Sequence, residues 1–282
     1  MVKRYSACFV FCLLGFLANS KDKISVLVNP KKVYIEIGED RQLLNFDFIV
    51  TNLSTDTLTL SRVSVEVFDK ENKLINTRFL DNNGTAPSIN TLEAKTFITG
   101  ESQLLFNPFH SFSLNFPLFK VHYEWVFTDT GNNETSVVTE VTPIVYKQKQ
   151  AFYFPIKGPT LIYDAHDFYA HHRRFNYEFG PIKSLGINSN FMRFGYDFAA
   201  LDSNNNKISA NGKKDEDFVG FGRPVYSIGE GKVIYASNSH KDDKTFDVRK
   251  IAGNPLELYG NCIAIMHADS IVSIYGHLKQ TA

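Results

Sequence analysis

The stretch "KVHYEWVFTDTGNNETSVVTEV", residues 120–141, decides the fold class of the first half of the chain. Tyr123, Trp125 and Phe127 recur at every second position, which places them on one face of a strand. Residues 129–133 contain Asp, Gly and Asn, which are typical of tight turns, and a second alternating run follows them. The stretch therefore predicts a β-hairpin with one buried face.

The same period of two continues through residues 23–149, in short runs separated by turn residues. The alternating apolar positions in two further runs are Val33, Ile35 and Ile37 in "KVYIEIGED", and Phe46, Phe48 and Val50 in "LNFDFIVTN". No long helical pattern interrupts these runs. We therefore expect an all-β fold that begins with an immunoglobulin-like β-sandwich over residues 23–149.

The first twenty residues, "MVKRYSACFVFCLLGFLANS", have the layout of a secretory signal peptide. A short basic segment precedes an apolar run that is too short to span a bilayer comfortably, and small residues follow. The sequence thus predicts a signal peptide over residues 1–20 and a secreted, periplasmic or cell-envelope protein; the alternative is an uncleaved N-terminal anchor. The mature chain has no other run of transmembrane length.

Composition limits the partners and the source of stability. The 282 residues include 30 basic and 30 acidic side chains, so nothing indicates a nucleic-acid partner. Removal of the first twenty residues would leave Cys262 as the single cysteine, which cannot form an internal disulfide. We expect stability to come from hydrophobic cores or from a metal ion.

A linker-like stretch near residues 146–154 separates the sandwich from a second domain, residues 154–282, which is glycine-rich and again β-like. "GRPVYSIGEGKVIYAS", residues 222–237, predicts a hairpin in which Pro224 begins an edge strand. "CIAIMH" and "SIVSIYGH" predict another hairpin, over residues 262–277.

The second domain also holds the side chains that could carry chemistry. These are His166, His171 and His172 in "DAHDFYAHHRRF", Asp197 in "MRFGYDF", and His267 and His277 in "IMHADSIVSIYGHL". Imidazole and carboxylate groups are ligands of catalytic zinc. Their spacing alone leaves alternatives open: Asp197 could accept backbone hydrogen bonds in the core, and "HHRRF" could be a solvated turn.

The order of four segments is more specific. They are Asp197-Phe198-Ala199, Gly222 through Val233, Gly260 through His267, and Tyr275 through Leu278. In this order they resemble the M23 family of zinc metallopeptidases, the lysostaphin and LytM type, which cleave peptide cross-links in bacterial peptidoglycan. The resemblance covers residues 154–282 and implies a partial M23-like antiparallel β-sheet domain.

The resemblance implies roles for individual residues. Asp197 matches a zinc ligand, and His277 matches a catalytic imidazole that orients the attacking water or stabilises the oxyanion. His267 matches a strand histidine that is not usually a ligand. The usual family pattern has a histidine four residues before the aspartate, where this chain has Arg193, and a guanidinium cannot bind zinc.

A variant of that family pattern, written Q-R-[YF]-A-x-D-F, takes its first histidine from further upstream. "MRFGYDF" is similar to it, which implies His172 as the first ligand and His171 as the alternative. His166 is a weaker candidate, and it or Asp167 could instead orient a ligating imidazole.

The family's third ligand comes from an H-x-H strand a few tens of residues after the segment that matches Tyr275 through Leu278, which would lie beyond Ala282. We therefore expect a domain without its C-terminal strands and a zinc site that is incomplete within these residues. Completed downstream, the chain would be an exported zinc endopeptidase that acts on peptidoglycan cross-link peptides. The alternative is a non-catalytic M23-like module that binds the cell wall or regulates another hydrolase. The expected partner is a peptidoglycan peptide or an envelope protein.

Overall fold

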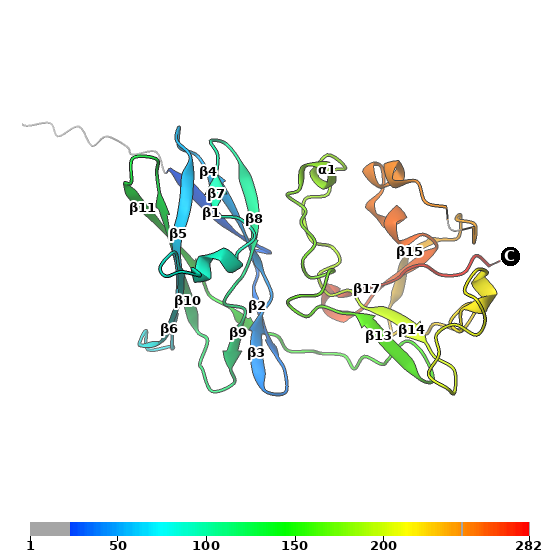
Figure 1. The fold of residues 1–282 in the computed structure, drawn as a ribbon. Helices are drawn as coiled ribbons and strands as arrows, with labels where there is room; N and C mark the ends of the chain where they lie inside the picture. The colour runs from blue at the N-terminus through cyan, green and yellow to red at the C-terminus, as the bar shows by residue number, and fades with distance from the viewer. Residues whose placement is uncertain (1–22, 244, 282) are drawn as a thin grey trace, which may run out of the picture.

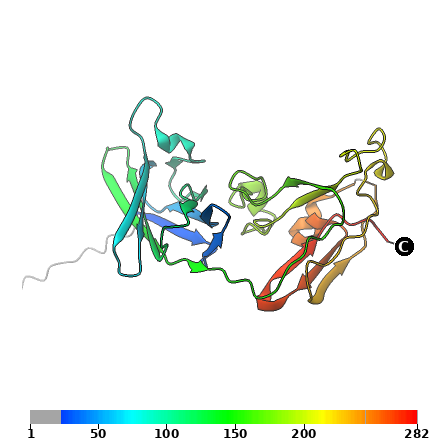
Figure 2. The ribbon, with the colours of Figure 1, turned by 90° about the horizontal axis from the view of Figure 1, so that it is seen from below.

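The computed structural model describes residues 23–243 and 245–281, and its regular structure is almost entirely β, which confirms the predicted all-β class (Figure 1). Two β-rich parts lie side by side and are joined by an extended stretch between strands β12 and β13 (Figure 2). The predicted signal peptide, residues 1–20, lies outside the described residues. None of the described helices is long and apolar enough to cross a membrane.

The N-terminal part consists of three sheets with strand orders β1-β4-β8, β11-β10-β5-β6 and β12-β2-β3-β9, and β7 pairs with β5. All neighbouring strands are antiparallel except β12 and β2. The elements are β1 (Ile24–Asn29), β2 (Tyr34–Ile37), β3 (Arg41–Leu44), β4 (Asp47–Asn52), β5 (Leu58–Phe68), β6 (Leu74–Asp81), η1 (Ser88–Thr91), β7 (Thr96–Phe97), β8 (Ser102–Phe106), β9 (Ser111–Ser113), β10 (Lys120–Thr128), β11 (Glu134–Val141) and β12 (Ile144–Val145).

The hairpin predicted from residues 120–141 is present as β10 and β11. The amide of Asp129 donates to the carbonyl of Asn133 across the turn, at 3.0 Å. Tyr123, Trp125 and Phe127 are buried as their alternation predicts. Trp125 meets Phe48 of β4 edge to face, with 4.6 Å between the ring centroids. Aromatic rings from strands of different sheets therefore fill the centre of the sandwich.

The alternation in the earlier strands holds with one exception. Phe46, Phe48 and Val50 are fully buried, but Ile37 is 60% exposed although Ile35 is buried. Strand β2 ends at Ile37, and the next residues form a turn closed by a hydrogen bond from the amide of Gly38 to the carbonyl of Arg41. Ile37 therefore continues the alternation of Val33 and Ile35 but not their burial, because the strand ends and the chain turns there.

The second part contains smaller sheets and more irregular structure. Strands β13 and β14 form an antiparallel pair, and β15, β16 and β17 form an antiparallel sheet in that order. The elements are β13 (Thr160–Asp164), α1 (Gly180–Lys183), β14 (Asp197–Ala200), η2 (Asp215–Asp217), β15 (Lys232–Ser237), η3 (Val248–Ala252), η4 (Pro255–Tyr259), β16 (Cys262–Met266), η5 (Ala268–Ser270) and β17 (Val272–Tyr275).

One of the two hairpins predicted for this part is formed. Strands β16 and β17 pair as expected, with Ile263 opposite Tyr275. The hairpin predicted over residues 222–237 is wrong, because strand structure begins only at Lys232 and β15 pairs with β16 instead. The segment before it lies along the linker, where the amide of Tyr226 donates to the carbonyl of Pro155.

The two parts share a small apolar core. Its buried members are Leu104 and Phe106 of β8, and Tyr177, Ile187 and Ile251 from the second part. Strand β8 faces the segment around α1 in Figure 1. The sandwich thus packs directly against the part of the chain that carries the candidate site residues.

Candidate metal centre

Two carboxylates face each other at one end of the ladder formed by β13 and β14. Asp164 is the last residue of β13, Asp197 is the first of β14, and they are cross-strand partners next to an irregularity after Ile162. Like charges directly opposite each other destabilise a strand pair. A cation between the two carboxylates would remove that repulsion.

Two adjacent histidines complete the group, from the turn after β13. His171 Nδ1 lies 2.8 Å from Asp164 Oδ2. His172 Nδ1 lies 3.7 Å from the same oxygen, and His172 Nε2 lies 3.7 Å from Asp197 Oδ2. One ligand atom from each of the four residues can be chosen so that all lie within 4.8 Å of one another.

The imidazole of His172 makes no direct hydrogen bond to either carboxylate, and only one of its two ring nitrogens can bind a given ion. A distance of 3.7 Å is too long for a hydrogen bond. Two ligands that are each about 2.1 Å from one tetrahedral zinc ion are roughly 3.4 Å apart, as the usual zinc bond lengths require. His172 is only 12% exposed, and its Nδ1 is buried without a hydrogen-bond partner in the described part of the chain. A buried polar atom without a partner is rare in native proteins.

The local backbone holds Asp164 ionised. Partial burial by itself opposes ionisation, but hydrogen bonds from the amides of His172 and Ala165 and the charges of the nearby imidazoles lower the pKa of Asp164 below its ordinary value. The amide of His172 is 3.3 Å from Asp164 Oδ2. A ligand carboxylate must be ionised to bind metal, and the two amide hydrogen bonds favour that form of Asp164. The imidazoles contribute only in their charged form, which cannot itself bind a metal ion.

Gly195 leaves room for the ring of His172. A Cβ atom at this position would lie 3.0 Å from His172 Nδ1 and 3.0 Å from the carbonyl oxygen of Met192. The amide of Gly195 donates to that carbonyl in the turn before β14. The glycine in "MRFGYDF" therefore lets the two segments approach closely enough for His172 and Asp197 to face each other.

The other residues singled out in the sequence lie outside this group of four. His166 Nε2 is 3.5 Å from Glu36 of the sandwich, and Asp167 is exposed. His267 is buried, with its two ring nitrogens 2.7 Å from the carbonyl of Glu230 and 2.7 Å from Ser273 Oγ. These contacts use both nitrogens of His267 in hydrogen bonds.

His277 is exposed and follows β17. Its φ of 55° lies in the left-handed region, and its amide donates to the carbonyl of Tyr259 at 2.7 Å. Residues other than glycine rarely adopt this conformation, and such positions concentrate at functional sites.

Sequence reasoning missed Asp164. The residue ends an exposed apolar strand, "TLIYD", and no motif marks it. The available signal is its position: a carboxylate at the last residue of one strand and another, Asp197, at the first residue of a later strand meet if the two strands are antiparallel neighbours. That pairing becomes visible only in the structure.

Comparisons with known proteins assign no family to the chain. No protein-family model matches the sequence, and no curated protein matches it significantly. Among solved structures, a structural-genomics target covers 44% of this chain and 88% of its own, with 8% identity and a TM-score of 0.33. The putative ApaA protein from Bordetella pertussis covers 44% of this chain and 95% of its own, with 10% identity and a TM-score of 0.31. At these scores the similarities carry no functional argument.

Proposed function

We propose that Asp164, His172 and Asp197 bind a zinc ion and that His171 holds Asp164 in place through a hydrogen bond. The observation that carries the proposal is the convergence of the four side chains, with ligand atoms within 4.8 Å, around His172, which is 12% exposed and has a ring nitrogen without a hydrogen-bond partner. Mixed imidazole and carboxylate ligands suit zinc, and they suit the hard cations calcium and magnesium less well.

The arrangement supports a hydrolytic role. Three protein ligands leave one position of a tetrahedral ion open, as in catalytic zinc sites. A zinc ion bound here would supply a Lewis acid for hydrolysis of an amide bond. Together with the resemblance of residues 154–282 to M23 peptidases, this supports an exported zinc endopeptidase that acts on the cross-link peptides of peptidoglycan.

His277 is the residue that we propose to assist the reaction. Its exposed imidazole can accept or donate a proton, and its left-handed backbone is a conformation that functional sites often retain. In this role His277 would orient the attacking water or stabilise negative charge on the scissile carbonyl oxygen.

One observation favours a non-catalytic alternative. A ring nitrogen of His171 is one of the four ligand atoms that lie within 4.8 Å of one another, so His171 could bind the ion directly. If all four residues bound the ion, they would fill a tetrahedral site, as in structural zinc centres. The chain would then bind the cell wall or regulate another hydrolase without catalysis.

Metal binding is tested first on the purified full chain. We expect about one zinc ion per chain by elemental analysis, and its loss in His172→Ala and Asp197→Ala. His166→Ala is the matched control, because it removes a neighbouring imidazole that lies outside the group of four. Absence of zinc from the wild type, or equal zinc in all four proteins, contradicts the proposed site.

The two zinc arrangements are separated by a second pair of variants. Asp164→Ala should weaken zinc binding more than His171→Ala, since removal of an orienting group costs about 10- to 100-fold in affinity and removal of a ligand costs more. An equal loss in both variants would make His171 a fourth ligand. In that case, release of no peptide from cross-linked peptidoglycan would establish the non-catalytic alternative.

A further inference from the structure

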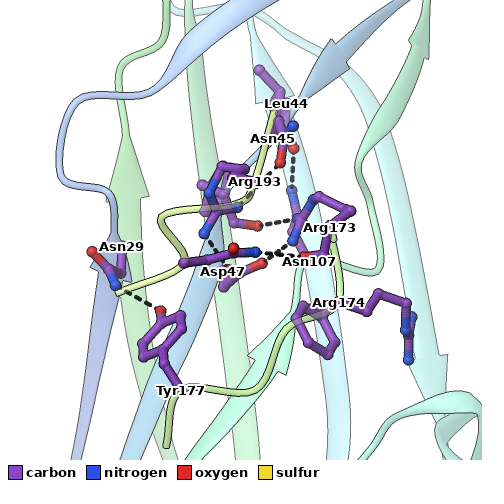
Figure 3. A network of polar contacts seen from close by, with 12 residues as sticks. Asn29, Leu44, Asn45, Asp47, Asn107, Arg173, Arg174, Tyr177 and Arg193 are labelled. Atoms are coloured by element: carbon purple, nitrogen blue, oxygen red, sulfur yellow. Dashed lines mark hydrogen bonds and ion pairs between the residues drawn. The ribbon is translucent and has the colours of Figure 1, made fainter. Parts of the chain in front are cut away.

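A single carboxylate of the sandwich joins the two parts of the molecule. Asp47 begins β4 and is fully buried. Its Oδ1 accepts a hydrogen bond from Arg173 at 2.6 Å, and its Oδ2 accepts one from Arg193. Figure 3 shows the two guanidinium groups converging on Asp47 from separate segments of the second part.

Further contacts hold both arginines against the same strand end. Arg173 also donates to the carbonyl of Phe46 at 3.0 Å. Arg193 donates to the side chain of Asn45 at 3.1 Å (Figure 3). Both arginines are almost fully buried, at 2% and 5% exposure. Guanidinium groups are seldom buried unless they are paired, so Asp47 supplies the charge that keeps them there.

The two arginines lie next to the candidate metal ligands. Arg173 directly follows His172 in the chain, and Arg193 stands four residues before Asp197. Between them, the side chain of Asn190 donates to the carbonyls of His172 and Arg173, at 2.9 and 3.0 Å. A buried polar network therefore extends from Asp47 to the backbone of both segments that carry ligands.

These segments have little regular structure to hold them. Residues 171–174 form a turn, and a hydrogen bond from the amide of Gly195 to the carbonyl of Met192 closes another turn over residues 192–195. The strand pair formed by β13 and β14 is short. Side-chain contacts must therefore fix the separation of His172 and Asp197. The contacts to Asp47 are the buried, charged members of that set.

We propose that Asp47 is a positioning residue of the metal centre, so that the sandwich is a structural component of the zinc site and not a separate binding module. The proposal rests on the proposed metal site for its functional consequence. Its physical basis, the immobilisation of two turns by one carboxylate, stands on the contacts of Asp47 alone.

The test uses the full chain with Asp47→Asn, which keeps the size of the side chain and removes its charge. The control is Asn52→Ala at the other end of β4, where an equally buried side chain donates to the carbonyls of Asp56 and Phe97. Both variants destabilise the sandwich, but only the first touches the arginines. Hydrogen exchange of the metal-free proteins and the affinity for added zinc are measured on all three.

We expect Asp47→Asn to accelerate amide exchange at residues 171–174 and 192–195 and to weaken zinc binding about 10- to 100-fold, the range for groups that orient ligands. The absorption spectrum of bound Co²⁺ should also change in Asp47→Asn and not in Asn52→Ala. If Asp47→Asn does not fold, Arg193→Lys serves in its place, because it keeps the charge and loses the forked geometry.

The outcomes separate the two proposals. Faster exchange in Asp47→Asn with no zinc bound by the wild type would overturn the metal site and keep only the immobilisation of the two turns by Asp47. Zinc binding by the wild type with unchanged affinity and spectrum in Asp47→Asn would overturn the positioning role and keep the metal site. Equal losses in Asp47→Asn and Asn52→Ala would show a general loss of stability and also overturn it.

Discussion

His110 shows how strongly the contact between the two parts changes a single residue. Its ring stacks on Phe168 of the second part, with 3.7 Å between the centroids and 5° between the planes. Burial, and then the nearby charge of Arg173, lower the pKa of His110 from 6.5 to about 4. The histidine is therefore neutral in the folded protein at pH values where it would be partly charged in the unfolded chain.

We expect stability to fall as the pH decreases from 6.5 toward 4, because the unfolded chain binds a proton at His110 in this range and the folded chain does not. Well above pH 6.5 His110 is neutral in both states, so the stability is not reduced by its protonation. Urea unfolding at several pH values measures it, and His110→Phe should retain the stacking and show a smaller loss on acidification. Parallel curves for the two proteins would contradict the expectation.

At the same scale, the sequence located part of the candidate site. The resemblance implied His172 and Asp197 as ligands, which stays a prediction, and the structure places His172 Nε2 3.7 Å from Asp197 Oδ2. Asp164 could not be predicted, because its role depends on which strand lies beside β13. Arg193 cannot bind a metal ion. Its burial could not be predicted either, because its partner Asp47 lies 146 positions away in the sequence.

Among the elements, β15 depends on the close approach of Gly231. A Cβ atom there would lie 2.6 Å from the carbonyl oxygen of Met266 and 2.6 Å from the side chain of Ile265, both in β16. Backbone atoms of a paired strand cannot move away cheaply. The absence of a side chain at Gly231 therefore allows the segment before β15 to lie close to β16.

Gly231→Ala should lower the free energy of unfolding by about 1–3 kcal/mol, the usual cost of overpacking. Gly180→Ala is the matched control, since a Cβ atom at the start of α1 would meet no atom within 4 Å. Thermal or urea denaturation compares them. Equal stability of the two variants would mean that the sheet relaxes around the added methyl group.

The predictable elements were those held by local pairing. The hairpins β10–β11 and β16–β17 connect neighbouring alternating runs, so period and turn residues suffice. The hairpin predicted from residue 222 onward was wrong because residues 222–231 contact the linker and not the following strand. Gly229 lies so close to the linker that a Cβ atom would be 2.6 Å from the side chain of Gln150. Such a contact has no signature in either segment alone.

Over the whole molecule, the shared apolar core and the ion pairs of Asp47 bind the two parts together. Phe106 packs in the core with Tyr177 and also lies 5.6 Å from the guanidinium of Arg173. The predicted boundary near residues 146–154 marks where the chain passes from the first part to the second. The energetic contacts cross that boundary, so we expect the parts to unfold together.

Two internal probes test this expectation. Trp125, the single tryptophan, lies in the sandwich, and the buried thiol of Cys262 lies in the second part. In a chain with Cys8 and Cys12 replaced by Ser, tryptophan fluorescence and thiol accessibility should change at the same urea concentration. Phe106→Ala should lower the urea midpoints of both probes. Different midpoints for the two probes in the chain that keeps Phe106 would contradict the expectation that the parts unfold together.

The burial of Asp47 also has a consequence for biosynthesis. Ribosomes make the chain from its N-terminus, and N-terminal domains generally fold first. The strand that carries Asp47 is complete more than a hundred residues before His172 and Asp197 emerge. A folded sandwich would then present its carboxylate to each arginine as it appears, so the earlier half of the chain acts as a template on which the later half assembles its ligands.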